Sequence, residues 1–317
     1  MTNFDNGLNL SEGKNVFLSV ILILFFSLIG ATIIGISIGL FAGFLFFDGN
    51  MSDYLDIMSG GIGDNRFKIP LYVMQGVSSI LGFIVIPALF MIMYEKRDIN
   101  DFFTKKMTFI SATLAVIIAV VFTGFNSWFV EWNMNIDFPE ALARFEHFAK
   151  NMESQAMETT KFLTDFGSPG IFLLAFIVIA IVPGIGEELV FRGFLQNYFH
   201  KAFNNIHIAI WISAAIFSAI HLQFYGFIPR MLLGALFGYL YHWSGNLLIP
   251  MLAHAANNAL MLIMMYLYQL NYFESNPMDV ENTEAVPLSL FLISGIVSFA
   301  LLFYFRKINS SLSVANE

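Results

Sequence analysis

Long apolar runs, separated by short polar segments, dominate this sequence. One helical crossing of a bilayer takes about 20 apolar residues. The pattern therefore predicts an all-α fold, a polytopic membrane helix bundle of about eight transmembrane helices with no separate soluble domain. The predicted spans lie near residues 17–47, 70–94, 109–130, 170–189, 207–223, 229–243, 247–270 and 287–305.

The chain divides into four predicted regions. They are a cytoplasmic N-terminal tail, a first membrane region with about three spans and an outer amphipathic segment, a membrane core that carries the chemistry, and a last part with a loop, the final span and a cytoplasmic tail. Their limits are 1–16, 17–168, 169–270 and 271–317. The first span, which begins at Phe17, is too long for the apolar core of a cleaved signal peptide, so we expect it to remain in the mature protein.

The segment 139–166 is too polar to cross a membrane. Apolar residues recur in it at helical spacing, among them Leu142, Phe145 and Met152, and Pro139 suits a helix start. This pattern predicts an amphipathic helix that lies on the outer leaflet or caps the bundle. An ordinary solvated helix in a loop is the alternative interpretation.

Orientation follows from the basic residues in short loops, because Lys and Arg gather on the cytoplasmic side. Such residues cluster in one loop and after the last span: Lys96, Arg97, Lys105, Lys106, Arg306 and Lys307. With eight spans, both termini are then predicted to be cytoplasmic. The sequence indicates an integral multi-pass protein, and without a visible eukaryotic targeting signal a bacterial cell membrane is favoured.

Composition excludes several classes of function. Apolar residues make up 57% of the 317 residues and charged residues 12%, which suits a body embedded in membrane lipid. There is no cysteine, so disulfides, cysteine-ligated metals and thiol nucleophiles are excluded. The formal net charge of −8 argues against nucleic acid as a partner.

The most informative polar cluster follows the apolar run 171–182. Ionisable groups in a membrane span cost roughly 2.5–3.5 kcal/mol each and usually mark function. Glu188 and Arg192 are four residues apart, so they share a helix face and are expected to pair. Glu187 points about 100° away from Glu188 and is left to face a cavity. Pro183 and the glycines after it predict a broken helix beside this cavity.

Two later spans each carry a histidine with a neighbour four residues away. Phe217 precedes His221 and is expected to wall the pocket, whereas Asn258 follows His254 and is able to donate a hydrogen bond. A single histidine in a span is more often a partner in helix packing than a catalytic group, so the joint pattern carries the interpretation. Three other histidines are expected at the membrane interface: His200, His207 and His242.

Three short motifs occur in this order along the chain: Glu187-Glu188-x-x-x-Arg192, Phe217-x-x-x-His221 and His254-x-x-x-Asn258. Over residues 170–270, the pattern resembles the CPBP family of membrane proteases, which includes CAAX-prenyl, bacteriocin-processing and Abi-type proteins. The resemblance implies intramembrane hydrolysis of a peptide bond in a membrane-associated or lipidated protein, with these glutamates, histidines and the asparagine at the active site.

Two mechanisms use the same residues. In the preferred one, which requires no cofactor, Glu187 is the base that activates water, His221 holds that water, and His254 and Asn258 donate to the oxyanion. Arg192 keeps Glu188 ionised. In the alternative, Glu187, His221 and His254 bind zinc, as the metalloprotease classification of the resembling family implies.

The depth of these residues poses a difficulty. If the spans are straight, Glu187 lies near the inner end of one and His221 near the outer end of the next, about 20 Å apart. We therefore expect a break at Pro183–Gly186, or a hairpin that enters the membrane after Gly193. A non-catalytic binding or immunity protein and a proton-coupled transporter remain alternative functions. The substrate, the cleavage site and the oligomeric state are not readable from the sequence.

Overall fold

The computed structural model describes residues 15–60, 63–272, 274, 276–277 and 287–314. Within these residues the chain is helical with no strand, apart from one isolated β-bridge between Phe103 and Asn246. The all-α prediction is confirmed. Almost all of the predicted N-terminal tail and much of the predicted last loop lie outside the described residues.

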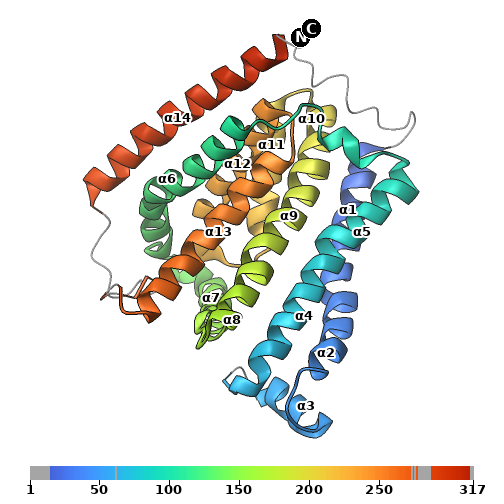
Figure 1. The fold of residues 1–317 in the computed structure, drawn as a ribbon, viewed down its shortest axis with the longest axis vertical. Coiled ribbons are helices and arrows are strands. Elements are labelled where there is room, and N and C mark those ends of the chain that lie inside the picture. Colours follow the sequence, from blue (N-terminus) through green and yellow to red (C-terminus); the bar gives the residue numbers. More distant parts are fainter. Residues whose placement is uncertain (1–14, 61–62, 273, 275, 278–286, 315–317) are drawn as a thin grey trace.

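The helices follow one another with short connections (Figure 1). Their bounds are α1 Val16–Ile29, α2 Ile36–Phe44, α3 Met51–Gly60, α4 Lys68–Ile80, α5 Ile86–Leu89, α6 Phe109–Met134, α7 Ala143–Thr164, α8 Pro169–Ala175, α9 Val182–Glu188, α10 Asn197–Phe203, α11 Ile206–Ala219, α12 Phe227–Ser244, α13 Leu248–Gln269 and α14 Leu288–Val314. Several are joined without a break by π-helical segments: η2 Gly30–Gly35, η4 Leu81–Val85, η8 Phe176–Ile181 and η9 Leu189–Gln196.

Among the residues that the structure describes, six helices are long and apolar enough to cross a membrane, and the protein is an integral membrane protein. They are Val16–Phe44, Asn65–Glu95, Phe109–Met134, Pro169–Phe203, Leu248–Gln269 and Leu288–Ser310. Helices α11 and α12 occupy the other two predicted positions but are not among the six, so the count of eight spans is not confirmed.

The start of α1 and the far end of α14 lie at the same end of the bundle (Figure 1). The segment that follows α5 lies there too, and its Lys105 carbonyl accepts a hydrogen bond from Asn246 Nδ2 at 2.7 Å. Ser111 Oγ at the start of α6 donates to Asn309 Oδ1 of α14 at 3.0 Å. Helices α3, α7 and α8 mark the opposite end. The basic segments used for orientation therefore share one end of the molecule.

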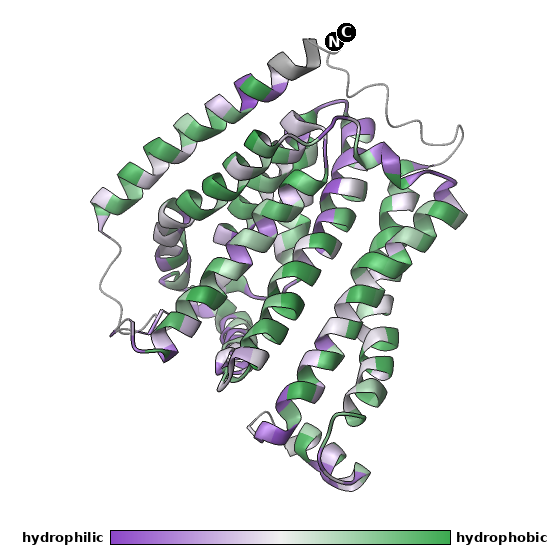
Figure 2. Cartoon of the chain, in the orientation of Figure 1, coloured by the Kyte–Doolittle hydropathy of each residue, from purple (hydrophilic) through white to green (hydrophobic). Residues whose placement is uncertain are grey.

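The exterior is apolar where lipid would surround it. Figure 2 shows apolar residues along the length of the long helices and polar residues gathered near helix ends and on α7. The exposed fractions of the large side chains Phe41, Ile296 and Phe303 are 70%, 69% and 72%. Such exposure is unfavourable in water but not in hydrocarbon, so it agrees with a membrane environment.

The first two spans pack backbone against backbone. A Cβ built on Gly35 would lie 2.6 Å from Ser78 Cα, and one built on Gly39 would lie 2.8 Å from Met74 Cα. Glycine is therefore required along this contact, because any larger side chain would push α2 and η2 away from α4. Close approach of small residues is a common means of helix association in membranes.

The predicted break at Pro183–Gly186 is wrong, whereas the alternative, a hairpin after Gly193, is present with its turn at Asn204. Residues 169–203 form one continuous helix, longer than the predicted span 170–189. The π-helical segment η8 ends at Ile181, two residues before Pro183, and accommodates a residue that lacks an N–H. Gly184 is used for packing instead, since a Cβ there would lie 2.9 Å from Ala255 N.

Candidate active site

Glu187 and His221 reach the same depth through an antiparallel helix pair. The long helix ends at Asn204, whose φ of 49° is left-handed, and Asn205 caps α11 by accepting from His207 N at 2.9 Å. Glu187 precedes Asn204 by as many residues as His221 follows it. The two residues therefore lie opposite each other across the turn. The predicted separation of about 20 Å came from ending the span too early.

Glu188 lies in a fully buried ion pair. Arg192 Nη1 donates to Glu188 Oε1 at 2.6 Å, one helical turn further along. Arg192 Nη2 donates to the Gly234 carbonyl of α12 at 2.7 Å. The guanidinium also lies against the rings of Phe217 and Phe237, 4.8 Å and 5.5 Å from their centroids. The pair thus joins the long helix to α12, and its charges are matched within the bundle.

His254 of α13 bridges the two glutamates. Its Nδ1 lies 2.8 Å from Glu188 Oε1, and its Nε2 lies 3.8 Å from Glu187 Oε2. Because the same Glu188 Oε1 already accepts from Arg192 Nη1, it is an acceptor, and His254 Nδ1 is the donor in this bond. The ring stacks on Phe237 at a centroid distance of 5.0 Å and meets Phe217 edge-on at 5.9 Å. Both contacts fix the direction of Nε2.

His221 lies two residues beyond the end of α11 and is fixed in one tautomer. Its Nδ1 lies 2.8 Å from the carbonyl oxygen of Phe217, which only accepts hydrogen bonds. Nδ1 therefore carries the proton, and in the neutral ring Nε2 remains free to accept. The ring of Phe217 meets the imidazole edge-on at 5.2 Å.

A cavity of about 470 Å³ lies among these residues. Five of the sequence-predicted residues line it: Glu187, Phe217, His221, His254 and Asn258. Glu188 and Arg192 do not. The Glu187 side chain is 16% exposed and that of Glu188 is 0% exposed, so neighbouring carboxylates meet different surroundings.

Asn258 has a structural partner that was not expected. Its Nδ2 donates to the Ile179 carbonyl at 3.3 Å, and its Oδ1 accepts from Asn257 Nδ2 at 3.4 Å. The side chain thus holds α13 against the long helix while it lines the cavity.

Several further polar residues line the cavity, although no sequence pattern predicted them to lie there. They are Gln75 of α4, Asn126 of α6, Glu153 of α7, and Arg230 of α12. Arg230 is an ionisable residue inside a predicted span, so the criterion that singled out Glu187 applies to it as well, whereas Gln75 and Asn126 carry no charge. The first membrane region therefore contributes to the same cavity as the motifs.

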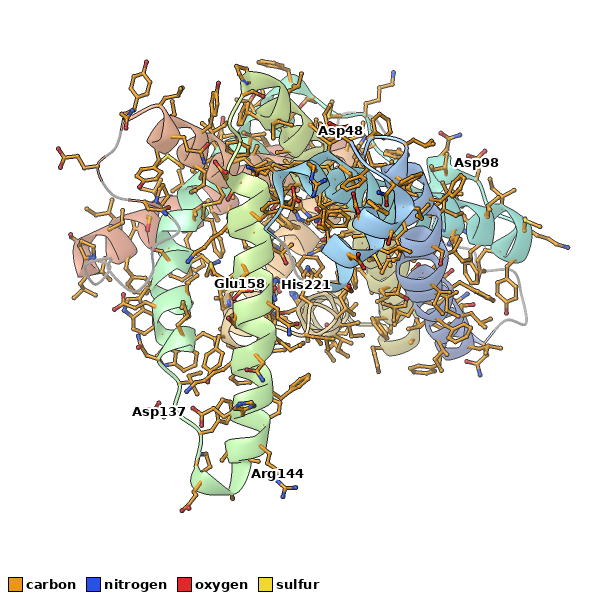
Figure 3. The ribbon with its side chains drawn as sticks, turned by 90° about the horizontal axis from the view of Figure 1, so that it is seen from below. Asp48, Asp98, Asp137, Arg144, Glu158 and His221 are labelled. Carbon is orange, nitrogen blue, oxygen red and sulfur yellow. The ribbon has the colours of Figure 1, made fainter. Side chains whose placement is uncertain are left out.

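Helix α7 closes one side of this cavity through Glu153 and Met157. Figure 3 shows α7 as a long helix with Asp137 and Arg144 at its far end and His221 beside its middle part. The amphipathic helix predicted for 139–166 is thus present, and it caps the site.

The candidate zinc ligands Glu187, His221 and His254 all line the cavity. Among the residues that the structure describes, no three His, Asp or Glu side chains are grouped so that they would hold a metal ion. This arrangement of side chains does not fit the zinc alternative. The other histidines lie at helix ends, where His207 Nδ1 is 2.8 Å from the Tyr239 hydroxyl.

Comparisons with known proteins agree with the resemblance. Residues 169–260 match the family model of Rce1-like type II CAAX prenyl endopeptidases, a range that contains all three motifs. The uncharacterised protein YpbD of Bacillus subtilis (strain 168) is 34% identical over 82 residues, which is 25% of this chain and 39% of YpbD. The match thus spans well under half of that relative. No solved structure matches.

Proposed function

We propose that this protein is an intramembrane endopeptidase that hydrolyses a peptide bond of a membrane-associated or lipidated substrate. One observation carries the proposal: Glu187, His221 and His254 face one cavity inside a membrane bundle, with a buried ion pair directly behind them. The match of residues 169–260 to the CAAX endopeptidase model supports the reaction class.

In this mechanism Glu187 is the general base. It takes a proton from a water molecule that also donates a hydrogen bond to His221 Nε2, the acceptor left free by the bond to Phe217. The hydroxide attacks the carbonyl carbon of the scissile bond, and the proton on Glu187 passes to the leaving amine. The carboxylate is thereby restored, and atoms and charges balance.

His254 and Asn258 stabilise the oxyanion of the tetrahedral intermediate. His254 acts here as an imidazolium, which donates from Nδ1 to Glu188 and from Nε2 into the cavity. Its positive charge, with that of Arg192, balances the two neighbouring glutamates. A cluster without net charge is favoured in a poorly solvated interior. Glu188 and Arg192 are positioning residues, because they orient the imidazole without lining the cavity.

A second, apolar pocket beside the cavity favours the proposal of a lipidated substrate. It has a volume of about 210 Å³, and Gln223 in its wall is hydrogen-bonded to Glu153 and Arg230, which line the larger cavity. Its walls are almost entirely apolar and come mainly from α7 and the residues around the end of α11: Phe145, Phe148, Ala149, Ala219, Leu222, Phe224 and Phe227. An apolar chain on a substrate would bury its surface there while the peptide reaches Glu187.

The test is cleavage of lipidated and unlipidated peptides by the purified protein in proteoliposomes. Glu187→Gln is expected to lower turnover by roughly 10²–10⁴-fold, the usual contribution of a general base. Glu158→Gln is the matched control, since Glu158 is exposed on α7 and does not line the cavity.

Two results would overturn the proposal. Turnover of Glu187→Gln near that of the wild type would remove Glu187 from the reaction. Proton-driven solute flux in proteoliposomes, without cleavage of any peptide, would instead identify a transporter.

A further inference from the structure

One cation in the cavity has no part in the hydrolysis described above. Arg230 lies in the first turn of α12 and lines the same cavity as Glu187 and His221. Its Nη2 donates to Gln223 Oε1 at 2.7 Å. Its Nη1 is buried and donates to no acceptor among the described residues. One of the two terminal nitrogens of the guanidinium, Nη1, therefore lacks a hydrogen-bond acceptor among the described residues.

The acidic side chain of Glu153 does not accept a hydrogen bond from Arg230 Nη1. Glu153 of α7 reaches Arg230 only through Gln223, whose Nε2 donates to Glu153 Oε1 at 3.4 Å. Glu153 Oε2 and Arg230 Nη1 are both buried without a hydrogen-bond partner among the described residues. Burial raises the pKa of the Glu153 carboxyl, while the charge of Arg230 acts in the opposite direction.

The position of Arg230 is fixed by the first membrane region. Asn126 Nδ2 of α6 donates to the Pro229 carbonyl at 3.2 Å, and Asn133 Oδ1 accepts from Ile228 N at 2.9 Å. Both contacts hold the start of α12 against α6. The guanidinium is therefore presented to the cavity by a rigid support, which lowers the cost of ordering it when a ligand binds.

A buried donor without an acceptor is unfavourable, and more so when the group is charged. Of the groups that a peptide offers, a carboxylate suits a guanidinium best, because two parallel N–H···O bonds match its fork. A backbone carbonyl would satisfy one N–H but leave the charge unmatched.

We propose that Arg230 binds a carboxylate of the substrate and thereby selects which peptide bond reaches Glu187. The inference rests on the proposed function and adds a specificity residue to it. A free chain end and an acidic side chain present the same chemistry to Arg230, and the experiment separates them.

The experiment compares three peptides that differ only at the C-terminus. The first has a free C-terminal carboxylate, the second is its C-terminal amide, and the third is a C-terminal amide whose last residue is glutamate. The wild type is expected to cleave one or both carboxylate peptides with a kcat/KM about tenfold or more above that of the plain amide, the size of a charge-assisted hydrogen bond. Preference for the first peptide assigns the chain end, and preference for the third assigns an acidic side chain.

Arg230→Gln is expected to abolish this preference, so that kcat/KM on the two carboxylate peptides falls to the value for the plain amide. Arg144→Gln, which removes an exposed cation at the far end of α7, should keep the preference. Equal loss on all three peptides would overturn the proposal, and so would a wild type without preference. If Arg230→Gln does not fold, the comparison of the three peptides with the wild-type protein still tests whether a substrate carboxylate is preferred.

Binding to Glu187→Gln separates this proposal from the proposed function. Fluorescently labelled acid and amide peptides are titrated against that variant and against the Glu187→Gln/Arg230→Gln double variant. If the carboxylate peptide binds more tightly only when Arg230 is present, the carboxylate site stands even without any cleavage. Cleavage by the wild type with equal binding of both peptides would refute the carboxylate site and keep the protease.

Discussion

The side-chain amide of Asn258 takes the place of a hydrogen bond that Pro183 does not make. In an α-helix the N–H of residue 183 would donate to the carbonyl of Ile179, but proline has no N–H. Asn258 Nδ2 donates to that carbonyl at 3.3 Å from the neighbouring helix α13. The contact stabilises the long helix next to Glu187.

Asn258→Ala is therefore expected to lower the free energy of unfolding by about 1–3 kcal/mol, because it leaves a buried carbonyl without this donor. In a Pro183→Ala background, where the backbone N–H returns, the same change should cost less. A double-mutant cycle on unfolding in detergent micelles measures the difference. Strictly additive effects would contradict this role, and Asn257→Ala serves as a control with a smaller expected loss.

Glu188→Gln is expected to destabilise the fold by roughly 3–5 kcal/mol, because it removes the counter-charge of a buried arginine. Glu188 Oε1 is the acceptor for both Arg192 and His254. Glu187→Gln should cost much less, since that side chain faces the cavity. Unfolding free energies of the two variants test this contrast. A Glu188→Gln variant that is fully stable yet inactive would reverse the two roles.

The mechanism without a cofactor predicts that a chelator-treated protein keeps its turnover. His254→Ala and Asn258→Ala should each lower turnover by about 10²–10³-fold, the usual effect of losing an oxyanion donor. Metal content by mass spectrometry is measured beside turnover for both variants. Stoichiometric zinc in the wild type, lost in His254→Ala and retained in Asn258→Ala, would replace this mechanism by the metal-dependent one.

The predicted topology is tested by cysteine labelling, since the chain has no native cysteine. Asn100→Cys lies in the segment with the basic residues and should react only from the cytoplasmic side. Ser52→Cys in α3, at the opposite end of the bundle, should react only from outside. Labelling of position 100 from outside alone would invert the orientation.

Gly35→Ala is expected to cost about 1–3 kcal/mol of unfolding free energy by overpacking. The new Cβ would lie 2.6 Å from Ser78 Cα, so η2 and α4 would have to separate. Gly170→Ala is the matched control, because its Cβ would meet only Ser168 Oγ at 3.9 Å. A loss of stability that is equal in the two variants would show that the backbone contact is not the cause.

The sequence by itself determined the features that depend on neighbours along the chain. Apolar runs of about 20 residues predict membrane helices wherever they occur. The spacing of four between Glu188 and Arg192 predicts their ion pair, because helix geometry brings such residues together. The amphipathic pattern of 139–166 predicts α7 for the same reason.

Only the tertiary structure decided which of these elements meet. The local preference of Pro183 to end a helix was overridden, because η8 and Asn258 accommodate the proline. The continued helix then brings Glu187 level with His221. The contact of His254 with Glu188, and the approach of Arg230 to the same cavity, join residues far apart in the chain. Such contacts depend on how apolar helix faces pack, and periodicity along one helix does not specify its partner.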